Sequence, residues 1–65
     1  MPRKIRQLVK DLEKAGFVFE PGRGDHRKFY HPKRPIPVIL DGKLGQDAKP
    51  YQERDVARAL RDIRK

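Results

Sequence analysis

The sequence has no cysteine and no tryptophan, and none of its apolar runs is longer than three residues. The lack of cysteine excludes disulfide bonds and the zinc sites that are built from cysteine. Such short runs exclude a membrane-spanning helix, which needs about 20 mostly apolar residues. The basic N-terminal residues are not followed by an apolar segment, so we expect no signal peptide and a cytoplasmic protein.

Acidic residues are also in short supply. Nine Asp and Glu stand against seventeen Lys and Arg, which gives a net charge of +8 and a pI near 10.3. A domain this basic usually binds a polyanion, such as a nucleic acid or an acidic protein surface. Residues 1–34 hold ten of the basic residues and only four of the acidic ones. We therefore expect the polyanion to contact mainly the first half of the chain.

Two amphipathic helices are predicted, one near each end of the chain. A chain of 65 residues has room for one small domain, whose core must come from helices and strands packed in two layers. Apolar residues recur at the helical spacing in residues 3–15 (Ile5, Leu8, Val9, Leu12) and in residues 50–63 (Val56, Ala59, Leu60, Ile63). Gly16 is well placed to end the first helix in the left-handed conformation.

Three short strands are predicted between the helices, at residues 17–20, 26–31 and 36–40. Glycines and prolines separate them and indicate turns. Because Pro37 has no N–H to donate, the third strand should lie at an edge of the sheet, or the nitrogen of Pro37 should face away from the neighbouring strand. A meander with residues 26–31 in the centre satisfies this. The sequence thus predicts an α+β fold of order α-β-β-β-α, in which two helices cover one face of a three-stranded antiparallel sheet.

Alternation along the strands assigns the side chains to two faces of this sheet. Phe29 is the only purely apolar residue of the middle strand, so it should face the helices. The other residues expected on that face are Phe17, Phe19, Ile36, Val38 and Leu40. The uncovered face should carry His26, Lys28 and Tyr30 beside Val18, Pro37 and Ile39. Exposed apolar side chains gathered there would form a docking surface for another protein.

Several of these residues follow the pattern of a known family. Leu12 to Phe17 reads LEKAGF, residues 24–29 read GDHRKF, and His31-Pro32 follows. This pattern resembles the HicA toxins, which pair with HicB antitoxins in type II toxin–antitoxin modules. The resemblance covers nearly the whole chain and implies one HicA-like domain over residues 1–65. It also implies a double-stranded-RNA-binding-like fold, cleavage of mRNA without a cofactor or metal, and a HicB-like antitoxin as partner.

The resemblance implies that His26 is the catalytic residue, because the family carries a functional histidine at the start of the middle strand. Imidazole suits the role, since it accepts and donates protons near neutral pH. Asp25 stands where the family has Ser or Thr, and its carboxylate could repel phosphate. The candidate RNA- and phosphate-binding residues are Arg23, Gly24, Arg27, Lys28 and Tyr30. The candidate antitoxin contacts are Val18, His26, Lys28 and Ile39.

His31 is the second histidine of the chain, and the strand geometry separates it from His26. The offset of five positions is odd, so the two rings should point to opposite faces, about 16 Å apart along a regular strand. We therefore expect neither an acid–base pair of histidines nor a metal site formed by Asp25, His26 and His31.

Two other functions fit the same sequence. A non-catalytic RNA-binding module of the same fold would use the same basic surface to hold RNA without cutting it. An interaction protein would use its charge only to recruit an acidic partner. RNA binding that weakens as salt rises would argue against the second of these.

Overall fold

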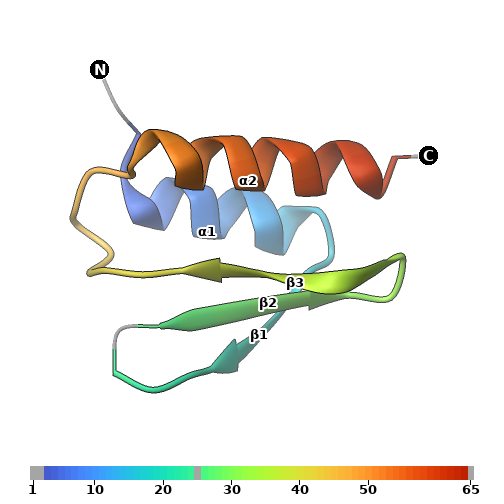
Figure 1. Cartoon of the computed structure of the whole chain (residues 1–65), viewed down its shortest axis with the longest axis horizontal. Coiled ribbons are helices and arrows are strands. Elements are labelled where there is room, and N and C mark those ends of the chain that lie inside the picture. The colour runs from blue at the N-terminus through green and yellow to red at the C-terminus, as the bar shows by residue number, and fades with distance from the viewer. Residues whose placement is uncertain (1–2, 25, 65) are drawn as a thin grey trace.

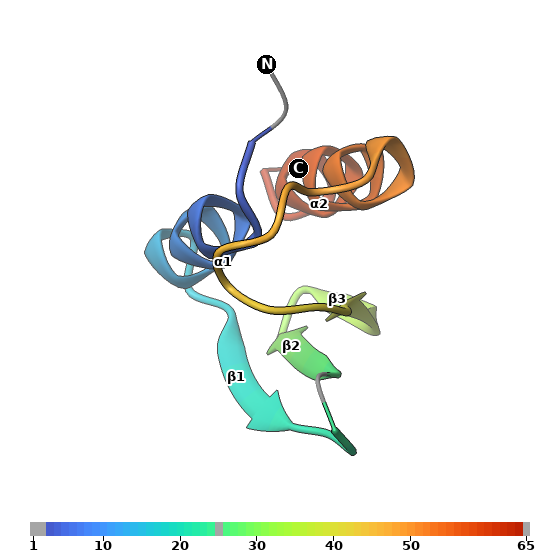
Figure 2. The ribbon, with the colours of Figure 1, turned by 90° about the vertical axis from the view of Figure 1, so that its left-hand side faces the viewer.

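In the computed structural model of the protein, residues 3–24 and 26–64 are described. The elements are α1 (Ile5–Lys14), β1 (Val18–Pro21), β2 (Arg27–His31), β3 (Arg34–Leu40) and α2 (Pro50–Asp62). This confirms the predicted α+β fold and its order α-β-β-β-α. Both helices lie on one side of the sheet, and the other face of the sheet is uncovered (Figure 1 and Figure 2). Within these ranges, neither helix has the length and apolar character needed to cross a bilayer.

The three strands form an antiparallel sheet in the order β1-β2-β3. The central position of β2 confirms the prediction, and Pro37 lies on the edge strand β3. Phe29 pairs with Phe19 of β1 and with Val38 of β3. Residues that pair across antiparallel strands share a face, so these three side chains point toward the helices.

Phe29 lies at the centre of the core, with none of its surface exposed. The apolar faces of α1 and α2 cover it, as the helical spacing of their apolar residues predicted. The buried apolar cluster consists of Ile5, Leu8, Leu12, Phe17, Phe29, Val38, Leu40, Ala48, Val56 and Ala59. Val9, Leu60 and Ile63, which the helical spacing also assigned to the core, are partly buried. Gly16 follows α1 with a φ of +96°, which confirms its left-handed conformation.

Two residues predicted to be inside are exposed. Ile36 is 66% exposed and Phe19 is 46% exposed. Phe29 pairs with Val38, and His31 pairs with Arg34. These two pairs are two residues apart along β2 but four residues apart along β3, so the register shifts between them. This irregularity displaces β3 from regular pairing around Ile36, so its side chain misses the core. Phe19 lies on the predicted face and packs against Phe29, with the ring centroids 5.5 Å apart. It is partly exposed because β1 leads away from the helices along its length (Figure 2).

The strand boundaries also differ from the predicted ones by a few residues. His26 precedes β2 rather than opening it, because its backbone N–H and C=O are used in the preceding turn. Phe17 precedes β1, since its N–H donates to the carbonyl of Leu12 at the end of α1 (3.0 Å). β3 is longer than predicted, since it begins at Arg34, two residues before the predicted start.

The long segment between β3 and α2 is fastened to the start of α1. The first amides of a helix have no partner inside the helix. Here Ile5 N–H donates to the carbonyl of Gln46 (2.9 Å) and Arg6 N–H to that of Leu44 (3.0 Å). Ala48 N–H donates in turn to the carbonyl of Arg3 (2.7 Å). Loop and helix end therefore satisfy each other's polar groups, which fixes the path of the chain away from β3.

Replacing Phe29 with alanine should destabilise the protein by about 3–5 kcal/mol, because a large side chain leaves the centre of the core. A small domain without staples has a total stability of only about 3–5 kcal/mol, so the variant should be largely unfolded. The matched control is Val18→Ala on the exposed face, which should change the stability by less than about 0.5 kcal/mol. Thermal and urea unfolding followed by circular dichroism measure both. A Phe29→Ala protein that melts like the parent would contradict this account of the core.

Candidate active site

His26 lies at the exit of a tight turn between β1 and β2. Gly22 N–H donates to the carbonyl of His26, and His26 N–H donates to that of Arg23, both at 3.1 Å. A Cβ at position 22 would lie 3.0 Å from the oxygen of His26, so the turn closes this tightly only around glycine. Gly24 has a φ of +59°, which glycine adopts without strain. The result is an imidazole that is 55% exposed at one end of the sheet.

Asp41 is the partner of this imidazole. Its Oδ1 atom is in hydrogen-bond contact with Nδ1 of His26. The strand register explains the contact, because Arg27 pairs with Leu40 at the last step of the β2–β3 ladder. His26 and Asp41 lie just beyond this last pair, His26 before β2 and Asp41 after β3. The Asp41 side chain is 49% exposed, so the pair stays accessible to a solute.

Arg27, a predicted phosphate ligand, points to the loop that follows β3. Its Nη1 atom donates to the carbonyl of Gly42, and the guanidinium is partly buried. Gly42 has a φ of +104°, and a Cβ there would lie 2.7 Å from Oε1 of Gln46. In this structure Arg27 therefore contributes to holding the turn that carries Asp41.

The other predicted phosphate ligands surround His26 in different ways. Arg23 and Gly24 are exposed in the turn itself, where a Cβ on Gly24 would meet nothing within 4 Å. Lys28 is half-buried on the uncovered face, where it pairs with Glu20 on one side and Ile39 on the other. The site therefore combines an open backbone turn with cationic side chains. Asp25, whose carboxylate entered the sequence prediction, lies outside the described residues.

Three exposed residues, Val18, Tyr30 and Ile39, share the uncovered face with Lys28. Val18 pairs with Tyr30, and Ile39 lies on the far side of β2 on the same face. Their exposed fractions are 64% for Val18, 36% for Tyr30 and 46% for Ile39. We call these three residues the outer-face patch. Apolar side chains gathered on a face that no helix covers are typical of an interaction surface.

His31 has a structural environment, as the alternation along β2 predicted. Its ring packs against Phe17 at a centroid distance of 5.0 Å, and its Nδ1 atom accepts a hydrogen bond from Lys33 N–H (3.0 Å). Phe17 is buried, so His31 lies on the helix side of the sheet at the opposite end of β2 from His26. The two histidines do not meet.

Asp41 was missing from the sequence prediction. It follows the third strand by one residue and lies 15 positions after His26, so no local motif links the two. In the structure the hairpin register pairs Leu40 with Arg27 and so places Asp41 opposite His26. With the middle strand predicted to begin at His26, the same end-to-end pairing sets Leu40 opposite His26, so the predicted strand bounds did not reveal the pair.

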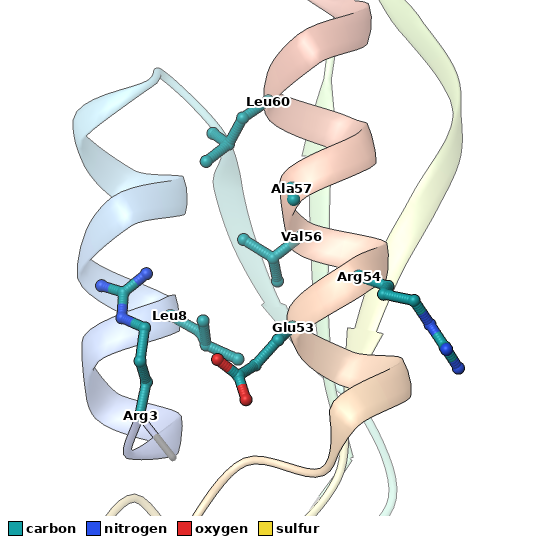
Figure 3. A pocket seen from close by; sticks show the side chains of 7 residues that line it. All are labelled: Arg3, Leu8, Glu53, Arg54, Val56, Ala57 and Leu60. Carbon is teal, nitrogen blue, oxygen red and sulfur yellow. The ribbon is translucent and has the colours of Figure 1, made fainter. Parts of the chain in front are cut away.

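A hollow lies between the two helices, away from His26, as Figure 3 shows. It has a volume of about 360 Å³ and is lined by Arg3, Leu8, Glu53, Arg54, Val56, Ala57 and Leu60. Arg3 is bound to Asp11 (2.6 Å), and that hydrogen bond raises the pKa of the Arg3 guanidinium. The lining includes no histidine, so it offers no imidazole that could exchange protons near neutral pH. The pair formed by His26 and Asp41 is the better candidate for acid–base chemistry.

The comparisons with known proteins bear on the family to which the chain belongs. Residues 5–63 match the family model described as the HicA toxin of bacterial toxin–antitoxin systems. Searches among curated proteins and among solved structures gave no match. The matched segment runs from the first residue of α1 to the end of α2 and includes His26, Asp41 and the outer-face patch. The chain therefore belongs to the HicA family of toxins.

Proposed function

We propose that this toxin is an endoribonuclease that cleaves mRNA and that His26 is its catalytic residue. The observation that carries the proposal is the exposed imidazole beside a glycine turn, with Arg23 exposed in the same turn and Lys28 on the uncovered face of the sheet. We take the α-β-β-β-α order as a double-stranded-RNA-binding-like fold, consistent with an RNA substrate. An mRNA substrate also places the protein in the cytoplasm.

In the proposed reaction the RNA supplies its own nucleophile. His26 takes the proton of a 2′-hydroxyl, the 2′-oxygen bonds to the neighbouring phosphorus, and the P–O5′ bond breaks. The leaving 5′-oxygen takes up a proton from water, and the imidazolium returns its proton to water. For this step the protein must supply a base and cations that stabilise the phosphorane, and no metal ion is required.

The surroundings of His26 supply the binding groups for this reaction. Arg23 and Lys28 offer charge-assisted hydrogen bonds to phosphate oxygens, and Arg27 adds positive charge behind the turn. The exposed Gly24 lets a phosphate approach the backbone closely. Tyr30 is 36% exposed on the same face and offers a ring on which an unpaired base can stack.

Membership of a toxin family of toxin–antitoxin systems implies an antitoxin partner. We propose that this partner is a HicB-like protein with an acidic surface that covers His26, Lys28 and the outer-face patch. A net charge of +8 favours an acidic partner. Docking over His26 would block the approach of the phosphate, which is the most direct way to inhibit the enzyme.

Replacing His26 with alanine should lower the rate of RNA cleavage by about 10²- to 10⁴-fold, the usual contribution of a general base. The fold and the affinity for RNA should hardly change, because the side chain is exposed. His31→Ala is the control, since it removes the other imidazole from the opposite face. Cleavage of labelled RNA in the presence of EDTA, with binding measured in parallel, gives both rates and affinities. A substrate with 2′-deoxyribose at the scissile position should resist cleavage.

A folded His26→Ala protein that cuts RNA at the parent rate would remove His26 from the mechanism. Cleavage of the 2′-deoxy substrate would indicate attack by water. A parent protein that binds RNA in a salt-dependent manner and never cuts it would support the non-catalytic RNA-binding module instead.

Antitoxin binding should respond differently to salt and to a charge in the patch. Rising salt should slow association, because charge steering acts mainly on the on-rate. Ile39→Asp should speed dissociation by about 30-fold or more, since a hot-spot loss of about 2 kcal/mol corresponds to that factor. Leu44→Asp is the matched control, because Leu44 is exposed to a similar degree (44%, against 46% for Ile39) but lies in the loop that is hydrogen-bonded to the start of α1. Surface plasmon resonance measures both rates, and an unchanged off-rate for Ile39→Asp would place the antitoxin elsewhere.

A further inference from the structure

The contact between Asp41 and His26 determines where the imidazole carries its proton. An ionised carboxylate has no proton to donate, so Nδ1 of the neutral imidazole must be the donor to Asp41 Oδ1. A neutral imidazole has one N–H, which leaves Nε2 with its lone pair. An Asp–His pair of this kind therefore holds the ring in one tautomer and presents Nε2 as a proton acceptor.

Asp41 is in turn held through its backbone by Gln52 of α2. Gln52 Nε2 donates to the carbonyl oxygen of Asp41 (3.1 Å), and Gln52 Oε1 accepts from Lys49 N–H (2.8 Å). The amide side chain thus connects the end of β3 to the first turn of α2. On the next residue, Arg27 donates to the carbonyl of Gly42. The carbonyl groups of Asp41 and Gly42 are therefore held by side chains from two different elements, α2 and β2.

Gln52 is a polar residue on the buried face of α2. Gln52 is 2% exposed and is the buried polar residue among those described. It lies on the same buried face of α2 as Val56 and Ala59, where an apolar side chain would pack without the cost of burying polar atoms. Burying an amide is unfavourable unless its donor and its acceptor are both paired. Both are paired here, and one of the two bonds ends on Asp41.

We propose that Asp41 is a positioning residue for His26 and that Gln52 is the buried anchor that holds Asp41 in place. Asp41 keeps Nδ1 protonated and turns Nε2 toward the substrate, while Gln52 fixes the peptide that carries the carboxylate. This inference rests on the proposed ribonuclease activity, which it deepens, and its physical part is measurable without RNA.

The test is the tautomer of His26, read from imidazole ¹⁵N shifts of the full-length protein at a pH where the ring is neutral. The parent should show one dominant tautomer with the proton on Nδ1. Asp41→Asn should mix the two tautomers, because an amide can either donate or accept. Asp41→Glu should retain the Nδ1–H form in part. The control is Asp47→Asn, which removes an exposed carboxylate of the same loop that pairs with Lys4 (2.5 Å) and should change nothing at His26.

Cleavage rates give the second measurement. Under single-turnover conditions Asp41→Asn should lower the rate by roughly 10-fold or more. Losing a buried aspartate that orients a histidine base costs up to about 10⁴-fold, and Asp41 is half-exposed. The concentration of protein for half-maximal rate should stay the same, because Asp41 makes no proposed contact with RNA. Asp41→Glu should recover part of the rate. Gln52→Met, which keeps the buried volume but loses both hydrogen bonds, should give a folded protein with a partly mixed tautomer and a smaller loss of rate.

The outcomes separate the two proposals. An unchanged ¹⁵N pattern in Asp41→Asn would overturn the positioning role, whatever the cleavage rate. Mixed tautomers with undiminished cleavage would overturn its part in the reaction. A folded Gln52→Met protein with the parent's tautomer would overturn the anchor. If the parent cuts no RNA but Asp41→Asn still loses the Nδ1–H form, the ribonuclease proposal fails while the structural role of Asp41 stands.

Discussion

The pairing of β2 with β3 is the constraint on which the other features depend. It places Val38 beside Phe29 and closes the centre of the core, and at its last step it pairs Arg27 with Leu40. One step further along both strands, it brings His26 to Asp41. Because side chains alternate along a strand, a slip of one residue would expose Phe29 and also separate this pair. The stability of the domain and the geometry of its candidate site are therefore set by the same register.

The segment after β3 connects the site to both helices. Its carbonyls at Leu44 and Gln46 accept from the first amides of α1, and Gln52 of α2 donates to Asp41. A polar loop of this length would ordinarily be mobile, because little apolar surface holds it down. Here the hydrogen bonds to the helix ends replace apolar contacts. The carboxylate beside His26 is thus supported by rigid elements, which suits a site that depends on orientation.

Much of this arrangement follows from local patterns in the sequence. The helix stripes, the glycine that ends α1, the central place of β2 and the inward Phe29 come from periodicity and backbone chemistry, which act over a few residues. Ile36 was misplaced because the shift in register between Phe29 and His31 depends on how two strands meet. Asp41 and Gln52 were missed for the same reason, since each acts through a partner 11 to 15 residues away. His26 itself was found through its likeness to a family, and its role stays a prediction.

The two faces of the sheet separate stability from recognition. The helix face holds Phe29 and the rest of the buried cluster, while the outer face leaves Val18, Tyr30 and Ile39 in contact with water. Leaving such side chains exposed contributes nothing to the stability of the isolated domain. Their burial would add to the stability of a complex, because apolar area is the main source of association energy at an interface core. A protein that docks on this face would meet the outer-face patch and the imidazole of His26 together. If His26 has the catalytic role proposed above, tight binding and inhibition would arise from the same surface.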